Sequence, residues 1–80
     1  MELRNMNEAE AFKSVLNSCI GSVWMVSTLN GRHYDMKNEH DQMLSMGKML
    51  SGNGRDMEIY ADTRADEAKI MNFMVEQMAA

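Results

Sequence analysis

The sequence predicts an α+β fold with the element order β-α-β-β-α-β-α, in which three helices cover one face of a four-stranded, mostly antiparallel sheet. Three stretches repeat apolar residues at helical spacing, and the stretch between the first two is rich in β-branched and aromatic residues. An Asn-Gly pair at positions 30 and 31 separates two strand-like runs, a pattern typical of a hairpin. Eighty residues support one hydrophobic core, so we expect a single domain over residues 1–80.

The first quarter predicts a short strand and then a helix. Residues 1–6 can form the strand, with Leu3 among its alternating positions. Asn7 is followed three residues later by Glu10, which is the spacing of an N-cap and an acid in the first turn of a helix. This pair predicts a helix over residues 8–19. The apolar residues expected to face the core are Phe12, Val15, Leu16 and Cys19.

A hairpin is expected next. Residues 22–28 (SVWMVST) and 32–37 (RHYDMK) predict its strands, and Asn30-Gly31 suits the two positive φ angles of a type I′ turn. Alternation along the second strand gives it two faces, with Tyr34 and Met36 on one and His33 and Asp35 on the other.

Two further helices flank a last strand at residues 56–62 (DMEIYAD). Asn38 predicts the cap of the first of them, and Gly52 suits the left-handed residue after its end. Thr63 and Asp66 resemble a capping box that opens the final helix, which runs through Met78. The expected inner positions are Met43, Met46 and Leu50 in the second helix, and Ala68, Met71, Met74, Val75 and Met78 in the third.

The charge of the chain argues against several classes of partner. Its net charge is −4, and its eight Lys and Arg residues are scattered. Because phosphate binding needs clustered basic residues, we expect neither nucleic acid nor an anionic membrane as a partner. No apolar run approaches the roughly 18–20 residues that span a bilayer, and the N-terminus lacks a signal-peptide pattern, so we expect a cytoplasmic location.

Three kinds of side chain could carry chemistry. Cys19 lies on the apolar helix face and is expected to be a small buried hydrophobe. A phosphoryl role for either histidine, His33 or His40, would need an arginine placed to hold the anion, and the sequence indicates none. Met43, Met46 and Met49 follow one another at intervals of three residues, and we call this set the methionine ladder. It could bind a soft metal such as Cu(I), although the same spacing is also typical of a packed helix face. We expect no cofactor.

Several short motifs follow one another from Ser22 onward. They are Asn30-Gly31, Met36-Lys37-Asn38, residues 43–47 (MLSMG), residues 57–61 (MEIYA) and residues 65–68 (ADEA). In this order they resemble the HPr phosphocarrier family of the bacterial sugar phosphotransferase system, with its Asn-Gly hairpin, aliphatic-Lys-Ser join, Met-Ser-Leu-Gly segment, last strand and final helix start. The resemblance implies an open-faced β-sandwich.

The N-terminal quarter departs from that family. HPr proteins carry NGLHARP before the first helix, with a phosphate-accepting histidine and a charge-balancing arginine. Here residues 3–12 read LRNMNEAEAF, without His or Pro and with Glu8 and Glu10 at the helix start. The family's regulatory serine aligns with Asn38, which has no hydroxyl. The resemblance thus implies the scaffold without either phosphorylation site.

We therefore expect a non-enzymatic, HPr-like regulatory or adaptor protein that contacts another protein in or near the phosphotransferase system, as a monomer or a homodimer. The candidate partner surface is Asn38, Met43 and Met46, and Asn38 is the degenerate regulatory position. Two alternatives stay open. One is a divergent phosphocarrier that uses His33 or His40, and the other is a soft-metal-binding domain built on the methionine ladder.

Overall fold

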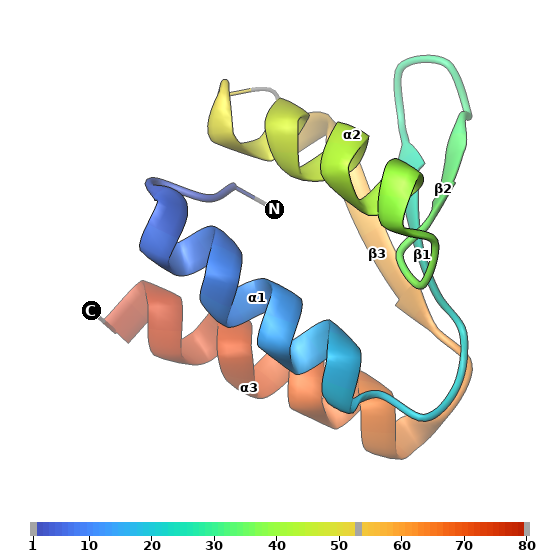
Figure 1. Cartoon of the computed structure of the whole chain (residues 1–80), viewed down its shortest axis with the longest axis vertical. Coiled ribbons are helices and arrows are strands. Elements are labelled where there is room, and N and C mark those ends of the chain that lie inside the picture. Colours follow the sequence, from blue (N-terminus) through green and yellow to red (C-terminus); the bar gives the residue numbers. More distant parts are fainter. Residues whose placement is uncertain (1, 53, 80) are drawn as a thin grey trace.

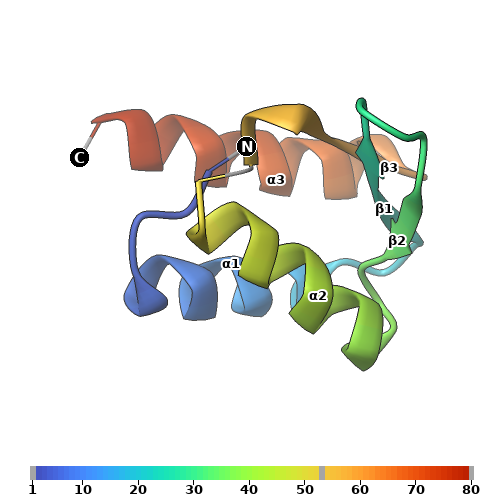
Figure 2. The ribbon, with the colours of Figure 1, turned by 90° about the horizontal axis from the view of Figure 1, so that it is seen from above.

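The computed structural model describes residues 2–52 and 54–79, with side chains through Gln77, and has two layers (Figure 1). Its elements are α1 (Met6–Ser18), β1 (Val23–Ser27), β2 (His33–Asp35), α2 (Glu39–Leu50), the 3₁₀ turn η1 (Gly54–Asp56), β3 (Met57–Ala61) and α3 (Arg64–Ala79). The strands form an antiparallel sheet in the order β2-β1-β3. Figure 2 shows α1, α2 and α3 on one side of this sheet and no described helix on the other.

The α+β class is confirmed, but the predicted first strand is wrong in the described part of residues 1–6, and Met1 lies outside the described residues. The N–H of Leu3 donates to the carbonyl of Met49, near the end of α2, at 3.4 Å. The Leu3 side chain is buried in the core. Because the segment before α1 is anchored at α2, it adds no strand, and the described sheet has three strands.

Helix α1 begins at Met6, two residues earlier than predicted, because Asn5 rather than Asn7 is the N-cap. Asn5 Oδ1 accepts the N–H of Glu8 at 3.0 Å, and the Glu8 carboxylate accepts the backbone N–H and Nε of Arg4 at 2.7 and 2.8 Å. This is close to a capping box, with the acid reaching back one residue further than usual. The buried face of the helix comprises Phe12 and Leu16, as predicted, and also Ala9.

The predicted hairpin is present, but its loop is longer than a type I′ turn. Ser27 donates its N–H to the carbonyl of Arg32 at 2.9 Å, and Gly31 donates to the carbonyl of Ser27 at 2.8 Å, which leaves a four-residue loop. Gly31 has a φ of 71°, whereas Asn30 does not have a positive φ. Asn30 instead accepts the N–H of Arg32 on its side chain at 2.9 Å, and so stabilises the loop locally.

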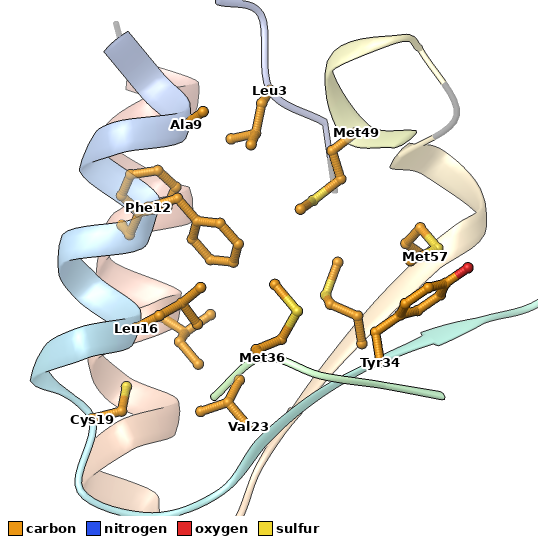
Figure 3. Close-up of a cluster of buried hydrophobic side chains, with 13 residues drawn as sticks. Leu3, Ala9, Phe12, Leu16, Cys19, Val23, Tyr34, Met36, Met49 and Met57 are labelled. Carbon is orange, nitrogen blue, oxygen red and sulfur yellow. The ribbon is translucent and has the colours of Figure 1, made fainter. Parts of the chain in front are cut away.

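The core lies between the helices and the inner face of the sheet. Figure 3 shows Phe12 and Leu16 of α1 pointing into its centre, and the Phe12 ring stacks on Phe73 of α3 with centroids 5.4 Å apart. The predicted alternation in β2 is confirmed, since Tyr34 is buried and His33 is exposed. The described core residues are Leu3, Ala9, Phe12, Leu16, Cys19, Val23, Met25, Tyr34, Met36, Met49, Met57, Ile70 and Phe73.

In α2 the buried stripe lies one position N-terminal to the predicted one. Its buried residues are Gln42, Ser45 and Met49, whereas Met43 is exposed, and Met46 and Leu50 are half-buried. Gln42 Nε2 donates to the carbonyl of Met36 at 3.0 Å, and Ser45 Oγ lies 3.1 Å from the Met36 sulfur. Polar side chains can therefore face the core here because they find partners inside it.

Helix α3 shows the same displacement. Its buried residues are Asp66, Ile70 and Phe73. The predicted inner residues lie elsewhere: Ala68, Met71 and Val75 are exposed, Met74 is half-buried, and the Met78 side chain is outside the described residues. The predicted Thr63 cap is confirmed, because Thr63 Oγ1 accepts the N–H of Asp66 at 3.1 Å. No helix in the described ranges is both long and apolar enough to cross a bilayer.

Asp66 does not reach back to Thr63 as the acid of a capping box would. Its carboxylate accepts the N–H groups of Ile20 and Gly21, at 3.1 and 2.7 Å, from the segment that leads out of α1. A Cβ at Gly21 would lie 3.2 Å from Asp66 Oδ2, so glycine permits this close approach. The buried carboxylate thus fixes the path of the chain between α1 and β1.

We predict that Asp66→Asn lowers the melting temperature by about 4 °C or more in a chain of this size. The N–H of Gly21, with that of Ile20, holds the pKa of the Asp66 carboxyl below its usual value. A depressed folded pKa means that the stabilisation is complete above the pKa of an unfolded aspartate, about 3.9, and is lost as the pH falls through the folded pKa.

Thermal denaturation between about pH 7 and about pH 2 measures this contribution. Glu67→Gln changes an exposed acid in the same helical turn and is the matched control. Equal melting temperatures for the two variants at neutral pH would contradict the role given to Asp66.

Candidate functional site

Residues 36–38 join β2 to α2 and also hold the end of α1. Lys37 Nζ donates to the carbonyl of Leu16 at 2.9 Å and to the carbonyl of Cys19. Helix α1 has no basic residue in its own last turn. Lys37 therefore supplies from another element the positive charge that stabilises a helix C-terminus.

Asn38, which the sequence resemblance aligns with a regulatory serine, is the N-cap of α2, and the predicted cap is confirmed. Its Oδ1 accepts the N–H of Asp41 at 3.0 Å. The Asp41 carboxylate accepts the N–H of Asp35 at 3.1 Å and so links the first turn of α2 to β2. The amide oxygen of Asn38 is thus engaged in holding the helix start.

Met43 and Met46, the other predicted partner residues, line a groove of about 330 Å³ between α1 and α2. Met43 is 68% exposed, and Met6, across the groove on α1, is 63% exposed. Gly47 leaves the groove open, because a Cβ at this position would meet nothing within 4 Å. The groove residues are Met6, Ala9, Glu10, Lys13, Gln42, Met43, Met46, Gly47 and Leu50, and we call this set the α1/α2 groove.

The groove is followed by a smaller hollow toward the start of α2. The hollow has about 180 Å³ and shares Lys13 and Gln42 with the groove, while Lys37 and Glu39 line its far part. Asn38 lies between these two residues in sequence but lines neither space. The structure therefore brings Met43 and Met46 together in one groove and leaves Asn38 beyond it.

The N-terminus of α1 is occupied by the side chains of its own segment. Arg4 forms an ion pair with Glu8, with the guanidinium nitrogen 2.6 Å from the carboxylate oxygen. The side-chain hydrogen bond from Arg4 lowers the pKa of Glu8. A phosphoryl group at this helix start would meet a carboxylate instead of free N–H groups.

The two histidines lie apart on the fold and are exposed. His33 is on the helix-free face of the sheet, with its ring 6.5 Å from that of Trp24. His40 is in the first turn of α2. Arg32, next to His33 in sequence, places its guanidinium over the Tyr34 ring, with 5.1 Å between the guanidinium carbon and the ring centroid. The Arg32 guanidinium is thus directed toward Tyr34 rather than toward the neighbouring imidazole of His33.

The sulfur-bearing candidates have different surroundings. Cys19 is buried, its thiol donates to the carbonyl of Val15 at 3.3 Å, and burial raises its pKa, as expected for an inert core cysteine. The methionine ladder runs from exposed Met43 through half-buried Met46 to fully buried Met49, so its members do not share one exposed face. Within residues 2–52 and 54–79, no group of three or more His, Cys, Asp or Glu side chains is placed to hold a metal ion.

Two residues that line the groove or the adjoining hollow, Met6 and Lys37, were not indicated by any sequence pattern. Met6 falls in the segment predicted as a strand, so its place across the groove from Met43 follows only from the earlier start of α1. Lys37 carries no local pattern that would connect it to Leu16, because their contact joins residues 21 positions apart. Recognising Asn5-x-x-Glu8 as a second possible cap could have indicated the position of Met6.

We predict that Asn38→Ala lowers the free energy of unfolding by about 0.5–2 kcal/mol, while Asn38→Ser and Asn38→Asp are nearly neutral, because each retains an oxygen that can accept the Asp41 N–H. Urea denaturation of the three variants measures the difference. A large loss of stability in Asn38→Ser would show that the amide has a role beyond capping.

Comparison of the chain with family models, curated proteins and solved structures finds no match.

Proposed function

We propose that this protein is a non-enzymatic, HPr-like regulatory or adaptor protein of the cytoplasm that acts by contact with another protein, in or near a bacterial sugar phosphotransferase system. The observation that carries the proposal of protein contact is the α1/α2 groove. The connection to the phosphotransferase system rests on the motif order of the sequence. The described elements from α1 onward follow the order that this resemblance implies.

The composition of the groove suits an adaptable protein contact. Met6 and Met43 expose most of their side chains on opposite sides, and Met46 and Leu50 form half-buried apolar surface between them. Methionine side chains are flexible and polarisable, so they adjust to the shape of a bound apolar surface. A groove between two helices is also the geometry in which an amphipathic helix docks its apolar face.

The net charge of the chain favours a partner with basic flanks. Glu10 lines the groove itself, and Glu39 and Asp41 lie in the first turn of the neighbouring helix. Lys13 also lines the groove and offsets Glu10, and Lys37 lines the adjoining hollow, so the preference rests on the charge of the whole chain. Because the whole chain has a net charge of −4, it would attract an apolar helix that is bordered by Lys or Arg.

Two features support the proposal that the protein does not carry a phosphoryl group. The helix start that carries the acceptor histidine in HPr proteins is here closed by Asn5, Glu8 and Arg4. The position of the regulatory serine is Asn38, whose amide oxygen caps α2. Each position has a structural role that needs no phosphoryl group.

We predict that incubation with phosphoenolpyruvate and active enzyme I leaves the intact mass of the protein unchanged. An authentic HPr in the same reaction is the positive control. A gain of one phosphoryl group that disappears in His33→Ala or His40→Ala would establish the phosphocarrier alternative instead.

We predict that Met43→Ser weakens capture of a specific partner by about tenfold, as expected when a central apolar contact is removed. Gly47→Gln should act similarly, because a side chain there projects into the groove while a helix-favouring residue replaces glycine. Leu44→Ser is the matched control, since Leu44 is partly exposed on the same helix but does not line the groove.

Cross-linking in a bacterial extract, followed by mass spectrometry of the cross-linked species, provides the readout for all three variants and the wild type. A partner captured equally well by all of them would contradict the assignment of the groove.

A further inference from the structure

The described strands place six side chains on the helix-free face of the sheet (Figure 2). Directly paired residues of an antiparallel sheet project their side chains to the same side. The pairing of β2, β1 and β3 forms two rows, Asp35, Trp24 and Tyr60 in the first and His33, Val26 and Glu58 in the second. We call these six residues the outer face.

Three of the six outer-face residues carry an aromatic ring. Trp24, on the central strand, is 38% exposed, and its strand partner Tyr60 is 53% exposed. The His33 ring lies 6.5 Å from the Trp24 ring, with an angle of 76° between the two planes. The open face of an antiparallel sheet commonly carries polar residues. This set of rings therefore indicates a surface that binds another molecule.

The charges of the outer face are negative. Asp35 and Glu58 are its acidic residues, and the described strands contain no Lys or Arg. Arg32, directly before β2, places its guanidinium over the ring of Tyr34, which belongs to the core on the opposite face. Nucleic acid is not a suitable ligand, because its phosphates would meet these carboxylates. A second copy of the outer face would bring further carboxylates toward them.

Each carboxylate of the outer face lies beside an aromatic ring. The Tyr60 hydroxyl donates to Glu58 Oε2 at 2.6 Å and so holds this carboxylate at the edge of the ring. Asp35 is the strand partner of Trp24, and its Oδ1 accepts the N–H of Lys37 at 2.9 Å. The two acids lie on opposite edge strands and in different rows, so their backbone positions are about 12 Å apart.

We propose that the outer face binds an extended, arginine-bearing segment of a partner protein. The guanidinium group is a planar cation that stacks on the faces of Trp and Tyr rings and pairs with a carboxylate through two N–H groups. An extended chain spans about 12 Å in about four residues. Two arginines at this spacing therefore each meet one ring and its neighbouring carboxylate, Trp24 with Asp35 and Tyr60 with Glu58.

The outer face is distinct from the α1/α2 groove of the proposed function. The two surfaces share no residue, and the helices that form the groove lie on the other side of the sheet. Either assignment can therefore fail while the other holds. Because the outer face is open to solvent, we expect a short peptide to bind with a dissociation constant between about 0.1 mM and about 5 mM.

Trp24 is the only tryptophan of the chain, so its fluorescence reports on the outer face directly. Titration of the full chain with the peptide acetyl-Arg-Ser-Gly-Ser-Arg-amide should change this fluorescence with saturation. The same peptide with citrulline in place of both arginines keeps their shape but removes their charge. We expect it to bind about threefold more weakly or worse, as the loss of an exposed cation–π contact implies.

Two acid variants separate a contact at the outer face from attraction by the whole chain. Glu58→Gln should raise the dissociation constant about threefold or more, while Glu10→Gln on α1 should leave it nearly unchanged. Each removes one negative charge, and glutamine at position 58 keeps an oxygen for the Tyr60 hydroxyl. Trp24→Leu, followed by amide chemical shifts, should weaken binding at least as much as Glu58→Gln, which keeps the test valid if the Trp24 variant does not fold.

Several outcomes would overturn the proposal. They are a fluorescence signal without saturation at about 10 mM peptide, equal binding of the citrulline peptide, and equal weakening in Glu10→Gln and Glu58→Gln. A Trp24 signal that changes with protein concentration alone would show that a second copy covers the outer face. Saturable binding of maltopentaose in place of the peptide would show a surface for neutral oligosaccharides. Either result would also overturn the assignment to an arginine-bearing segment.

Discussion

Three charged side chains from other elements hold the segment that leads from α1 into the sheet. Lys37 and Lys69 donate to its carbonyls, with Lys69 Nζ 2.7 Å from the carbonyl of Ser18, and Asp66 accepts two of its amides. A helix end that lacks basic residues of its own and turns directly toward a buried strand would otherwise leave backbone groups unsatisfied. The path of the chain at this point thus depends on the β2–α2 join and on α3 at the same time. This dependence ties together all three helices and the sheet of a domain that buries little surface per residue.

Local features of the fold could be predicted from the sequence because their causes are local. Asn38 and Thr63 cap the helices that follow them, Gly52 has the expected positive φ, and the strands on both sides of Asn30-Gly31 pair as a hairpin. The cap of α1 could not be located from this pattern alone, because Asn5-x-x-Glu8 and Asn7-x-x-Glu10 repeat it two residues apart. Packing decided between them, because Leu3 and Ala9 both enter the core when the helix starts at Met6.

The orientations of α2 and α3 could not be predicted from apolar residues alone, and both differ from the prediction in the same direction. One residue corresponds to about 100° of rotation around a helix. In each helix this rotation replaces exposed methionines with polar residues on the buried side, namely Gln42 and Ser45 in α2 and Asp66 in α3. All three have partners inside the protein, in Met36 and in the amides of residues 20 and 21. The same rotation exposes Met71 and also Met43, which lines the α1/α2 groove, so this surface was as hard to foresee as the orientations.

The sulfur content of the core has a consequence for how sharply the fold is defined. Met25, Met36, Met49 and Met57 occupy the space between the helices and the sheet. Ordering a buried methionine costs up to about 1.5–2 kcal/mol of side-chain rotamer entropy, more than ordering a leucine or isoleucine. In return, its flexible chain can fill irregular gaps that a branched residue would leave empty or overfill. Replacement of these residues by leucine or isoleucine would therefore exchange adaptability for a lower entropic cost, with the outcome at each position set by the shape of the space that the sulfur and terminal methyl now fill.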